Sequence, residues 1–275
     1  MEIINELPDA VFDRIDDLLA FVSIYDDEQR TAAYLDLLQR HADDIRGAVC
    51  VEAGCGFGLL SEKLAQLGAR KVYAVEANQH LAKIARERLA PYDNTVVIEG
   101  DVADLCPIER VDVLVHELFG QLLFDEDIYS LQSLNFEPRL WLPDEALLKV
   151  ALHRSQEYVD DVVTPQVLFE TKGALISGLF EEEAVQDGLE VMRWTPSKFP
   201  RHVDVDLSGK SGDLLCFFLE IYHQKRLICR TGECSNWAPV WTARAGDSFR
   251  LQFRPQSRGA AVFFKWASEN AGLKS

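Results

Sequence analysis

The sequence has no long apolar run and little positive charge. No apolar segment in the 275-residue chain approaches the length of about 20 residues that is needed to cross a bilayer. The acidic start, MEIINELPDAVFDRIDD, lacks the basic-then-apolar pattern of a secretory signal. Lysine and arginine number 28 against 45 acidic residues, giving a net charge of −17. The missing apolar run and signal pattern predict a cytoplasmic protein. Because an acidic surface repels phosphate backbones and anionic lipids, we expect basic substrates, and neither nucleic acid nor membranes as partners. Solubility alone would also explain the acidity.

Metal-binding patterns are missing as well. The six histidines form no HxxxH or HExxH pair, and the cysteines have no CxxC spacing and lie mostly in apolar stretches. We therefore expect no metal, and buried free thiols in a reducing compartment rather than zinc ligands or disulfides. The cysteines are Cys50, Cys55, Cys106, Cys216, Cys229 and Cys234.

The spacing of apolar residues changes along the chain. Residues 6–46 have helical spacing, with charges on the other faces. From about residue 48, short apolar runs alternate with amphipathic stretches. Strands that are apolar throughout and alternate with helices indicate a parallel sheet covered on both faces. The predicted strands are 48–53, 71–77, 95–101 and 111–118, and the predicted helices are 58–69 and 80–92.

After residue 148 this alternation ends. Strand-like runs such as LLKVALHR, LLCFFLEIY, SFRLQFR and AAVFFKWA are separated by glycine, proline and serine clusters, and residues 176–192 are predicted as a helix. We therefore predict an α/β protein with a mainly antiparallel second half. Its parts are an N-terminal helical segment (1–46), a Rossmann-like domain (47–143) and a β-rich, barrel-like domain (144–275).

The segment VCVEAGCGFG, residues 49–58, predicts a ligand site. A buried strand runs into Gly54, Gly56 and Gly58 and then directly into a helix. Glycines at such a turn let the backbone approach a ligand closely. The GxGxG spacing does not meet the dinucleotide pattern GxGxxG, which disfavours a nicotinamide oxidoreductase. Taken alone, the turn could be only a tight strand–helix connection.

Two further segments extend this site. Glu76 ends the next strand, where a carboxylate can accept hydrogen bonds from ribose hydroxyls, so the glycine turn and the acid together favour a nucleoside-type cofactor. After the third strand, Asp101 or Asp104 could accept from an exocyclic amine while Val102 packs on an adenine ring. A plain polar loop explains this last segment equally well.

These segments resemble those of the protein arginine methyltransferases. VCVEAGCGFGLLS and KVYAVEAN are similar to the family's glycine loop and ribose-binding strand, and DDEQRTAAY (26–34) is similar to its D-E-x-R-T motif. HELFGQLLFDE (116–126) is similar to its double-glutamate loop, with Glu117 and Glu126 nine residues apart (126 − 117). RLWLPDEALL resembles the boundary between its two domains, and SNWAPVW (235–241) its Trp-bearing loop.

The resemblance implies S-adenosylmethionine as the cofactor and the guanidinium of arginine as the methyl acceptor. Glu117 and Glu126 would be catalytic, Asn236 and Trp237 would bind the substrate, and Arg30 would pair with the cofactor's carboxylate. A homodimer would suit the family. The cofactor contacts would be Arg30, Glu52, Gly54, Cys55, Gly56, Gly58, Glu76, Ala77, Asp101, Val102 and Ala103. Trp141 and Trp266 are assigned to packing.

The chain also departs from the family pattern. His116 stands where many members have serine, and Asn236 where a histidine commonly pairs with the acid at the position of Asp27. The Tyr-containing helix that clamps the cofactor is not recognisable before residue 24, and Ala103 replaces an acidic adenine contact.

Two alternatives stay open. One is methyl transfer to free arginine or another small guanidino or amino metabolite, which the short second half favours. The other is a catalytically silent, methyltransferase-like binding subunit. The silent subunit is disfavoured because the residues that the chemistry needs are all present. These are Arg30, Gly54, Glu76, Glu117 and Glu126.

Overall fold

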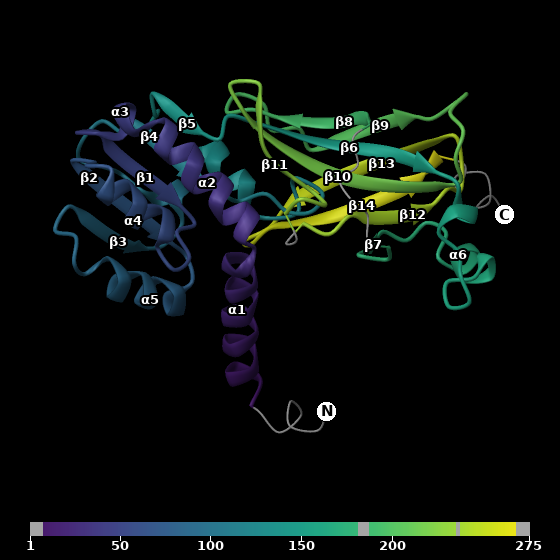
Figure 1. Ribbon diagram of the computed structural model, residues 1–275, viewed down its shortest axis with the longest axis horizontal. Helices are drawn as coiled ribbons and strands as arrows, with labels where there is room; N and C mark the ends of the chain where they lie inside the picture. The colour runs from purple at the N-terminus through teal and green to yellow at the C-terminus, as the bar shows by residue number, and fades with distance from the viewer. Residues whose placement is uncertain (1–7, 181–186, 235–236, 268–275) are drawn as a thin grey trace. The chain divides into compact units, whose positions relative to one another are not determined.

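The computed structural model describes residues 8–180, 187–234 and 237–267, and the chain divides into two compact units (Figure 1). The first unit consists of the chain up to Glu117 together with Ser133–Pro143. The second consists of Leu118–Gln132 together with the chain from Asp144 onward. The segment that resembles the double-glutamate loop is thus divided, with Glu117 in the first unit and Glu126 in the second.

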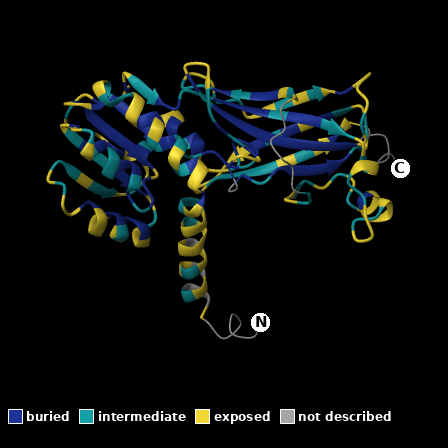
Figure 2. Cartoon of the chain, in the orientation of Figure 1, coloured by how far each residue is buried: buried dark blue, intermediate teal, exposed yellow. Residues whose placement is uncertain are grey.

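The first unit begins with helices, as predicted for residues 6–46. The side chain of Asp27 caps α2 by accepting a hydrogen bond from the backbone N–H of Arg30 at 2.9 Å. Much of α1 is exposed, whereas α2 buries Tyr34, Leu37 and Leu38 (Figure 2). The helices are α1 (Asp9–Asp26), α2 (Glu28–Arg40) and α3 (Ala42–Ile45).

A five-stranded parallel sheet forms the core of the first unit, in the order β3-β2-β1-β4-β5. Its central strand β1 is buried at all five positions, which is why the predicted strands are apolar throughout. The predicted strands and helices of this region are confirmed, and the three-residue β5 is an addition. The elements are β1 (Val49–Ala53), α4 (Leu59–Gln66), β2 (Lys71–Glu76), α5 (Gln79–Leu89), β3 (Thr95–Glu99), η2 (Val102–Asp104), β4 (Val113–His116) and β5 (Leu140–Leu142).

The second unit is built mainly from antiparallel strands, which confirms that prediction. One sheet has the order β7-β12-β10-β6-β8, with β11 also paired to β10, and the other has the order β14-β13-β9. The strands are β6 (Glu145–His153), β7 (Ile176–Ser177), β8 (Leu189–Trp194), β9 (His202–Asp206), β10 (Leu214–His223), β11 (Arg226–Arg230), β12 (Val240–Ala243), β13 (Ser248–Pro255) and β14 (Ala260–Trp266).

Aromatic side chains join these two sheets. Phe217 of β10 packs edge-to-face against Phe249 of β13 and Phe264 of β14, with ring centroids 5.6 and 6.1 Å apart. Trp266 of β14 extends the cluster. Its assignment to packing is therefore correct, since its side chain is fully buried there.

The prediction of a helix over 176–192 is wrong. Residues 176–177 form β7 and residues 189–194 form β8, while 181–186 lie outside the described residues. Gly178 has a positive φ of 62°, which interrupts helical backbone. A short helix, α6 (Pro165–Glu170), lies upstream instead, capped by the hydroxyl of Thr164 and with proline at its first position. Besides η2, the described residues form the 3₁₀ segments η3 (Asp127–Ser133) and η4 (Ser155–Glu157).

The cysteines differ from expectation at three positions. Cys50, Cys55 and Cys216 are free and buried, as predicted, and Cys106 is free but exposed. Cys229 and Cys234 form a disulfide. The turn that follows β11 brings their Cα atoms to 6.5 Å, within the range that a disulfide can span. The expectation of free thiols is wrong for this pair.

Two features are absent from the described part of the chain. No helix there is both long and apolar enough to cross a membrane. Within the same ranges, histidine, cysteine and carboxylate side chains form no group of three or more that could hold a metal ion.

Candidate active site

Three segments meet at the carboxyl edge of the parallel sheet in the first unit. The register pairs Ala53 of β1 with Val75 of β2 on one side and with His116 of β4 on the other. Gly54, Glu76 and Glu117 therefore follow neighbouring positions at one sheet edge. The strand order reverses between β1 and β4, and ligands of open α/β sheets bind at such a point.

The glycine loop depends on backbone that other residues rarely adopt. Gly54, Gly56 and Gly58 have φ values of 71°, 50° and 81°, all in the left-handed region. A Cβ on Gly56 would lie 2.8 Å from the hydroxyl of Tyr25 and 3.0 Å from the ring of Phe21. The loop is therefore glycine-rich because of its own geometry and because α1 packs closely against it.

Replacing Gly56 by alanine should destabilise the first unit. We expect Gly56→Ala to lower the free energy of unfolding by about 1–2 kcal/mol from its positive φ, with a further loss from the Tyr25 contact. Gly47→Ala is the matched control, since Gly47 has a φ of 73° and an added Cβ would have no atom within 4 Å. Urea denaturation of both variants tests this, and equal losses would contradict a close approach at Gly56.

Tyr25, in the last turn of α1, is a site residue that sequence reasoning missed. Its hydroxyl donates to the carbonyl of Cys55 at 3.2 Å and accepts from the N–H of Phe57 at 3.1 Å. Its ring stacks on Phe57 with centroids 5.1 Å apart. Burial raises the pKa of Tyr25, so it stays a neutral donor. No sequence signal indicated this contact, because residues 25 and 55 are far apart in the chain.

Glu76 organises the same loop. Its buried carboxylate accepts from the N–H of Gly56 and, through its other oxygen, from the N–H of Asn78, both at 2.8 Å. Each carboxylate oxygen has two acceptor positions, so a carboxylate can accept more hydrogen bonds than these two. Asn78 in turn caps α5 through its side chain. Ala77, between these two residues, is exposed.

Glu52 lies on β1 directly before the loop and is only 2% exposed. The hydroxyl of Ser61 on α4 donates to its carboxylate. Burial, with a smaller contribution from the nearby charge of Glu76, raises the pKa of Glu52 to about 8, against the lowering effect of hydrogen bonds with Ser61. Cys55 in the loop is also buried, and burial raises the pKa of its thiol.

The raised pKa of Glu52 gives stability a pH dependence of known sign. A glutamate in the unfolded chain titrates near about 4.3, while folded Glu52 holds its proton up to about 8. Between these values the folded state binds more protons, so stability falls as pH rises, by at most about 1.4 kcal/mol per pH unit. Glu52→Gln should flatten this slope in denaturation curves recorded from pH 5 to 8. An unchanged slope would show that Glu52 is ionised in the folded protein.

The segment predicted beside an adenine ring has a defined structure. Asp101 caps η2 by accepting from the N–H of Ala103 at 2.9 Å, and Val102 is buried. The carbonyl of Ala103 accepts from the side chain of Asn135 at 2.6 Å. The register of β2 with β3 pairs Glu76 with Glu99, which brings this segment to the same edge.

Arg30 and Glu117 form a buried ion pair, with side chains 6% and 15% exposed. Arg30 lies in the first turn of α2, and Glu117 directly follows β4. The other carboxylate oxygen of Glu117 is buried and accepts no hydrogen bond from any described residue. A buried carboxylate oxygen of this kind favours a charged donor, because leaving it unsatisfied costs free energy.

His116 is part of the sheet core. Its side chain is fully buried on β4, with its ring 6.3 Å from that of Trp141 in an edge-on arrangement. Burial lowers its pKa to about 3, although a hydrogen bond with the backbone of Pro143 opposes this. His116 is therefore neutral, and the departure from serine at this position concerns packing. The contact agrees with the assignment of Trp141 to packing.

Glu126 lies in the second unit, on an exposed part of the loop 118–132. Both neighbouring residues are anchored to the turn between β13 and β14. The carbonyl of Asp125 accepts from the N–H of Ala260 at 3.3 Å, and the carboxylate of Asp127 accepts from the N–H of Gly259. The backbone at Glu126 is thereby held on both sides while the residue itself is exposed.

Trp237 is buried in the second unit, with 3% of its surface exposed. Its indole N–H donates to the carbonyl of Phe119 at 3.0 Å. The Trp-bearing segment is thereby tied to the loop that carries Glu126. Asn236 lies outside the described residues.

Known proteins with similar sequences provide independent evidence about this site. The family described as "Methyltransferase domain" matches residues 50–131. "Probable protein arginine N-methyltransferase 6.1" of Oryza sativa subsp. indica is 38% identical over 125 residues, which cover 44% of this chain and 32% of that protein. "Probable protein arginine N-methyltransferase 6.2" of the same plant is 32% identical over 186 residues, covering 61% and 46%. The chain thus spans less than half the length of these curated relatives.

Solved structures extend the likeness to both units. The Trypanosoma brucei PRMT1 enzyme–prozyme heterotetrameric complex with AdoHcy has a chain that matches with a TM-score of 0.65. The match covers 90% of this chain and 94% of that one at 19% identity, and so shows a shared fold. By sequence over part of its length, and by fold over both units, this chain is therefore similar to the protein arginine methyltransferases.

Proposed function

We propose that the protein is an S-adenosylmethionine-dependent methyltransferase that modifies a guanidinium nitrogen of arginine in a peptide or protein. One observation carries the proposal. Glu117, at the carboxyl edge of the sheet and beside the glycine loop, binds a guanidinium group of its own chain through one oxygen and has a second buried oxygen without a hydrogen-bond partner among the described residues. The site is thus chemically suited to guanidinium groups.

The residues at this edge fit the cofactor. The left-handed glycine loop gives close backbone access, Glu76 places a carboxylate that can accept from ribose hydroxyls, and Val102 adds an apolar side chain to the same edge. Arg30 would hold a carboxylate, and its several N–H donors allow it to keep Glu117 at the same time. When bound, S-adenosylmethionine supplies a methyl group already activated by its sulfonium.

The two glutamates suit the acceptor's chemistry. A guanidinium is planar, always charged, and has delocalised lone pairs that make its nitrogens poor nucleophiles. Two carboxylates on different N–H edges would localise positive charge away from one nitrogen and orient it. In this proposal Glu117 and Glu126 form that pair, and Trp237 positions the loop of Glu126 through Phe119. Alignment of the reacting groups then provides much of the acceleration.

A substrate panel tests this proposal. We expect transfer of labelled methyl groups to an arginine-containing basic peptide, and faster transfer than to free arginine. The rate at low peptide concentration should fall as salt increases through the range where the Debye length is about 8–10 Å, because the acidic protein attracts the basic peptide. Faster methylation of free arginine would favour the metabolite alternative, and salt-independent turnover of a neutral acceptor would contradict the proposal.

We also propose that the protein forms a homodimer. Apolar surface is exposed at and near α6. It comes from Val167 and Phe169 on the helix and from Val162 before it, and Phe169 is 58% exposed. The related Trypanosoma brucei enzyme assembles as a heterotetramer with its prozyme. Light scattering should give twice the mass of the 31.1 kDa chain, and Phe169→Asp should reduce the measured mass to that of a single chain. Phe263→Asp, an exposed phenylalanine on β14, is the control; a monomeric wild type would contradict the proposal.

A further inference from the structure

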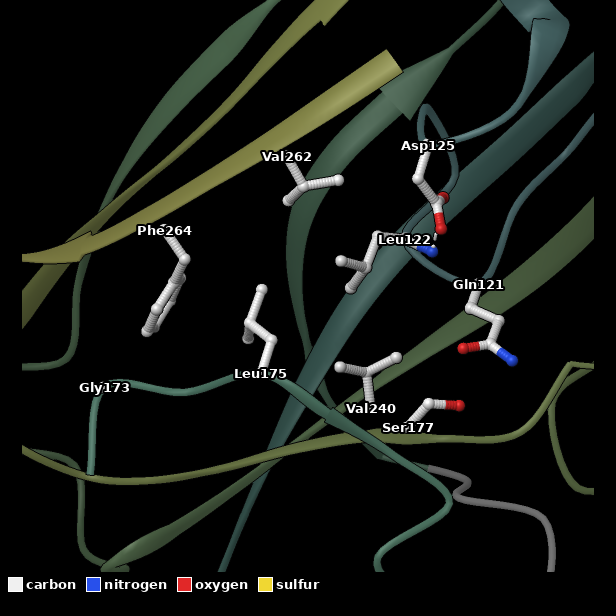
Figure 3. A pocket seen from close by; sticks show the side chains of 9 residues that line it. All are labelled: Gln121, Leu122, Asp125, Gly173, Leu175, Ser177, Val240, Val262 and Phe264. Carbon is white, nitrogen blue, oxygen red and sulfur yellow. Dashed lines mark hydrogen bonds between the residues drawn. The ribbon is translucent and has the colours of Figure 1, made fainter. Parts of the chain in front are cut away.

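The second unit contains a pocket of about 380 Å³ that has no role in the methyl transfer proposed for Glu117 and Glu126 (Figure 3). It is lined by residues of the loop that carries Glu126, by the chain leading into β7, and by β12 and β14. This volume lies within the roughly 300–1,000 Å³ of small-ligand sites and accommodates a single large side chain with room to spare.

Five of the nine residues that line the pocket are apolar. Leu122, Leu175, Val240, Val262 and Phe264 direct their side chains into the same space (Figure 3). Because side chains alternate along a strand, Val262 and Phe264 lie on one face of β14. Contacts of the Phe264 ring with Phe217 and Phe249 fix that wall in place. The pocket therefore favours an apolar group.

Three polar side chains line the pocket, and two of them are uncharged. Gln121 and Ser177 are labelled on the same side of Figure 3, and an amide and a hydroxyl can bond a peptide backbone. Asp125 is the one charged lining residue, and its carboxylate accepts from the N–H of Leu122 at 2.8 Å within its own loop. Because backbone N–H groups of its own loop already bond the Asp125 carboxylate, a cation would lose its hydration and only share that acceptor. An anion would lose its hydration and meet a like charge, so charged groups are disfavoured.

The pocket adjoins the proposed substrate loop. Asp125 lines it, and Glu126 is the next residue, with consecutive Cα atoms about 3.8 Å apart. A group in the pocket therefore lies within a few residues of any guanidinium that Glu126 binds. Free arginine has a single side chain and cannot fill both places, whereas a peptide with an arginine and a neighbouring side chain can.

We propose that this pocket binds an uncharged, apolar side chain of the acceptor peptide, close in sequence to the arginine that is methylated. The inference rests on the proposed function and narrows it. The substrate is then a peptide segment in which an apolar residue accompanies the arginine, and the pocket selects such segments over free arginine.

A positional peptide scan tests this. Peptides with one arginine in a glycine-rich background carry leucine, alanine, lysine or glutamate at each nearby position in turn. At one position, leucine should exceed alanine in kcat/KM by about tenfold, mainly through KM, since partial burial of a leucine side chain is worth about that factor. Lysine and glutamate at that position should fall to the alanine value or below.

A charge in the pocket should switch this preference. In Leu175→Glu the favoured residue at the same position should change from leucine to lysine, an outcome that a loss of stability would not produce. Ala174→Glu is the matched control, because Ala174 is exposed on the same loop and does not line the pocket. That variant should keep the leucine preference.

The outcomes separate the two proposals. If every arginine peptide is methylated with the same kcat/KM whatever its neighbours, the pocket is not a substrate site, and the proposed function stands. If leucine is preferred but Leu175→Glu leaves that preference unchanged, the apolar contact lies elsewhere and the inference is wrong. If no arginine peptide accepts a methyl group, both proposals fail.

Discussion

Glu117→Gln and Glu126→Gln are each expected to slow methyl transfer to an arginine peptide by about two to three orders of magnitude. Glutamine keeps the size of glutamate, but replaces one acceptor oxygen with an NH₂ donor that would face the N–H donors of a guanidinium. Loss of one ionic partner from a desolvated pair costs about 2–5 kcal/mol, and tenfold in rate corresponds to about 1.4 kcal/mol. Initial rates at saturating cofactor measure the effect.

The two variants should differ in their other properties. Glu117 is largely shielded from solvent and paired with Arg30, so Glu117→Gln leaves a buried guanidinium with a neutral partner and should also lower stability. Glu126 is exposed, so Glu126→Gln should fold like the wild type. The double variant should be far less than multiplicatively slower, because the pair is proposed to act as one unit.

Glu137→Gln serves as the control, since Glu137 is exposed in the first unit and has no assigned role. Its rate should equal that of the wild type. Near wild-type rates for both Glu117→Gln and Glu126→Gln would mean that these carboxylates are ordinary loop residues and that the guanidinium site lies elsewhere.

Glu76→Gln is expected to weaken S-adenosylmethionine binding by about two orders of magnitude. The carboxylate accepts N–H bonds from Gly56 and Asn78, and an amide in its place turns one acceptor into a donor that faces an N–H. The same change removes charge from bonds to ribose hydroxyls, each worth about 1.5–3 kcal/mol. Calorimetric titration with the cofactor measures the loss of affinity.

Glu99→Gln is the matched control for this variant. Glu99 pairs in register with Glu76 on the neighbouring strand, but its carboxylate is exposed and bound to Arg86. Its cofactor affinity should stay within about twofold of the wild type, a difference well below 1 kcal/mol. If Glu76→Gln binds as tightly as Glu99→Gln, the cofactor is not held at the end of β2.

The parallel-sheet unit could be predicted from sequence because its signals are local. Buried parallel strands read as continuous apolar runs, and the glycine turn and Glu76 fall at strand ends. The contact of Tyr25 with the loop joins residues 25 and 55, far apart in the chain, and no spacing rule indicates it. Even so, the D-E-x-R-T similarity located Arg30 on the helix that follows.

The second unit was harder to predict because its pairings are distant in sequence. β6 pairs with β10 and β10 with β12, so the runs that could be recognised as strands did not reveal their neighbours. The region 176–192 has mixed polar and apolar residues without clear period-2 alternation, and only tertiary pairing makes Leu189–Trp194 a strand. The Cys229–Cys234 disulfide depends on the turn after β11, and no cysteine spacing motif in the sequence predicts that turn.

The most direct measurement is the identity of the methylated residue. The protein is incubated with S-adenosylmethionine and a peptide holding one arginine and one lysine, and with a second peptide in which that arginine is replaced by lysine. Mass spectrometry should show added methyl groups on the arginine side chain of the first peptide, and none on the second. Methylation of lysine, or of both peptides alike, would contradict a site built for the guanidinium group.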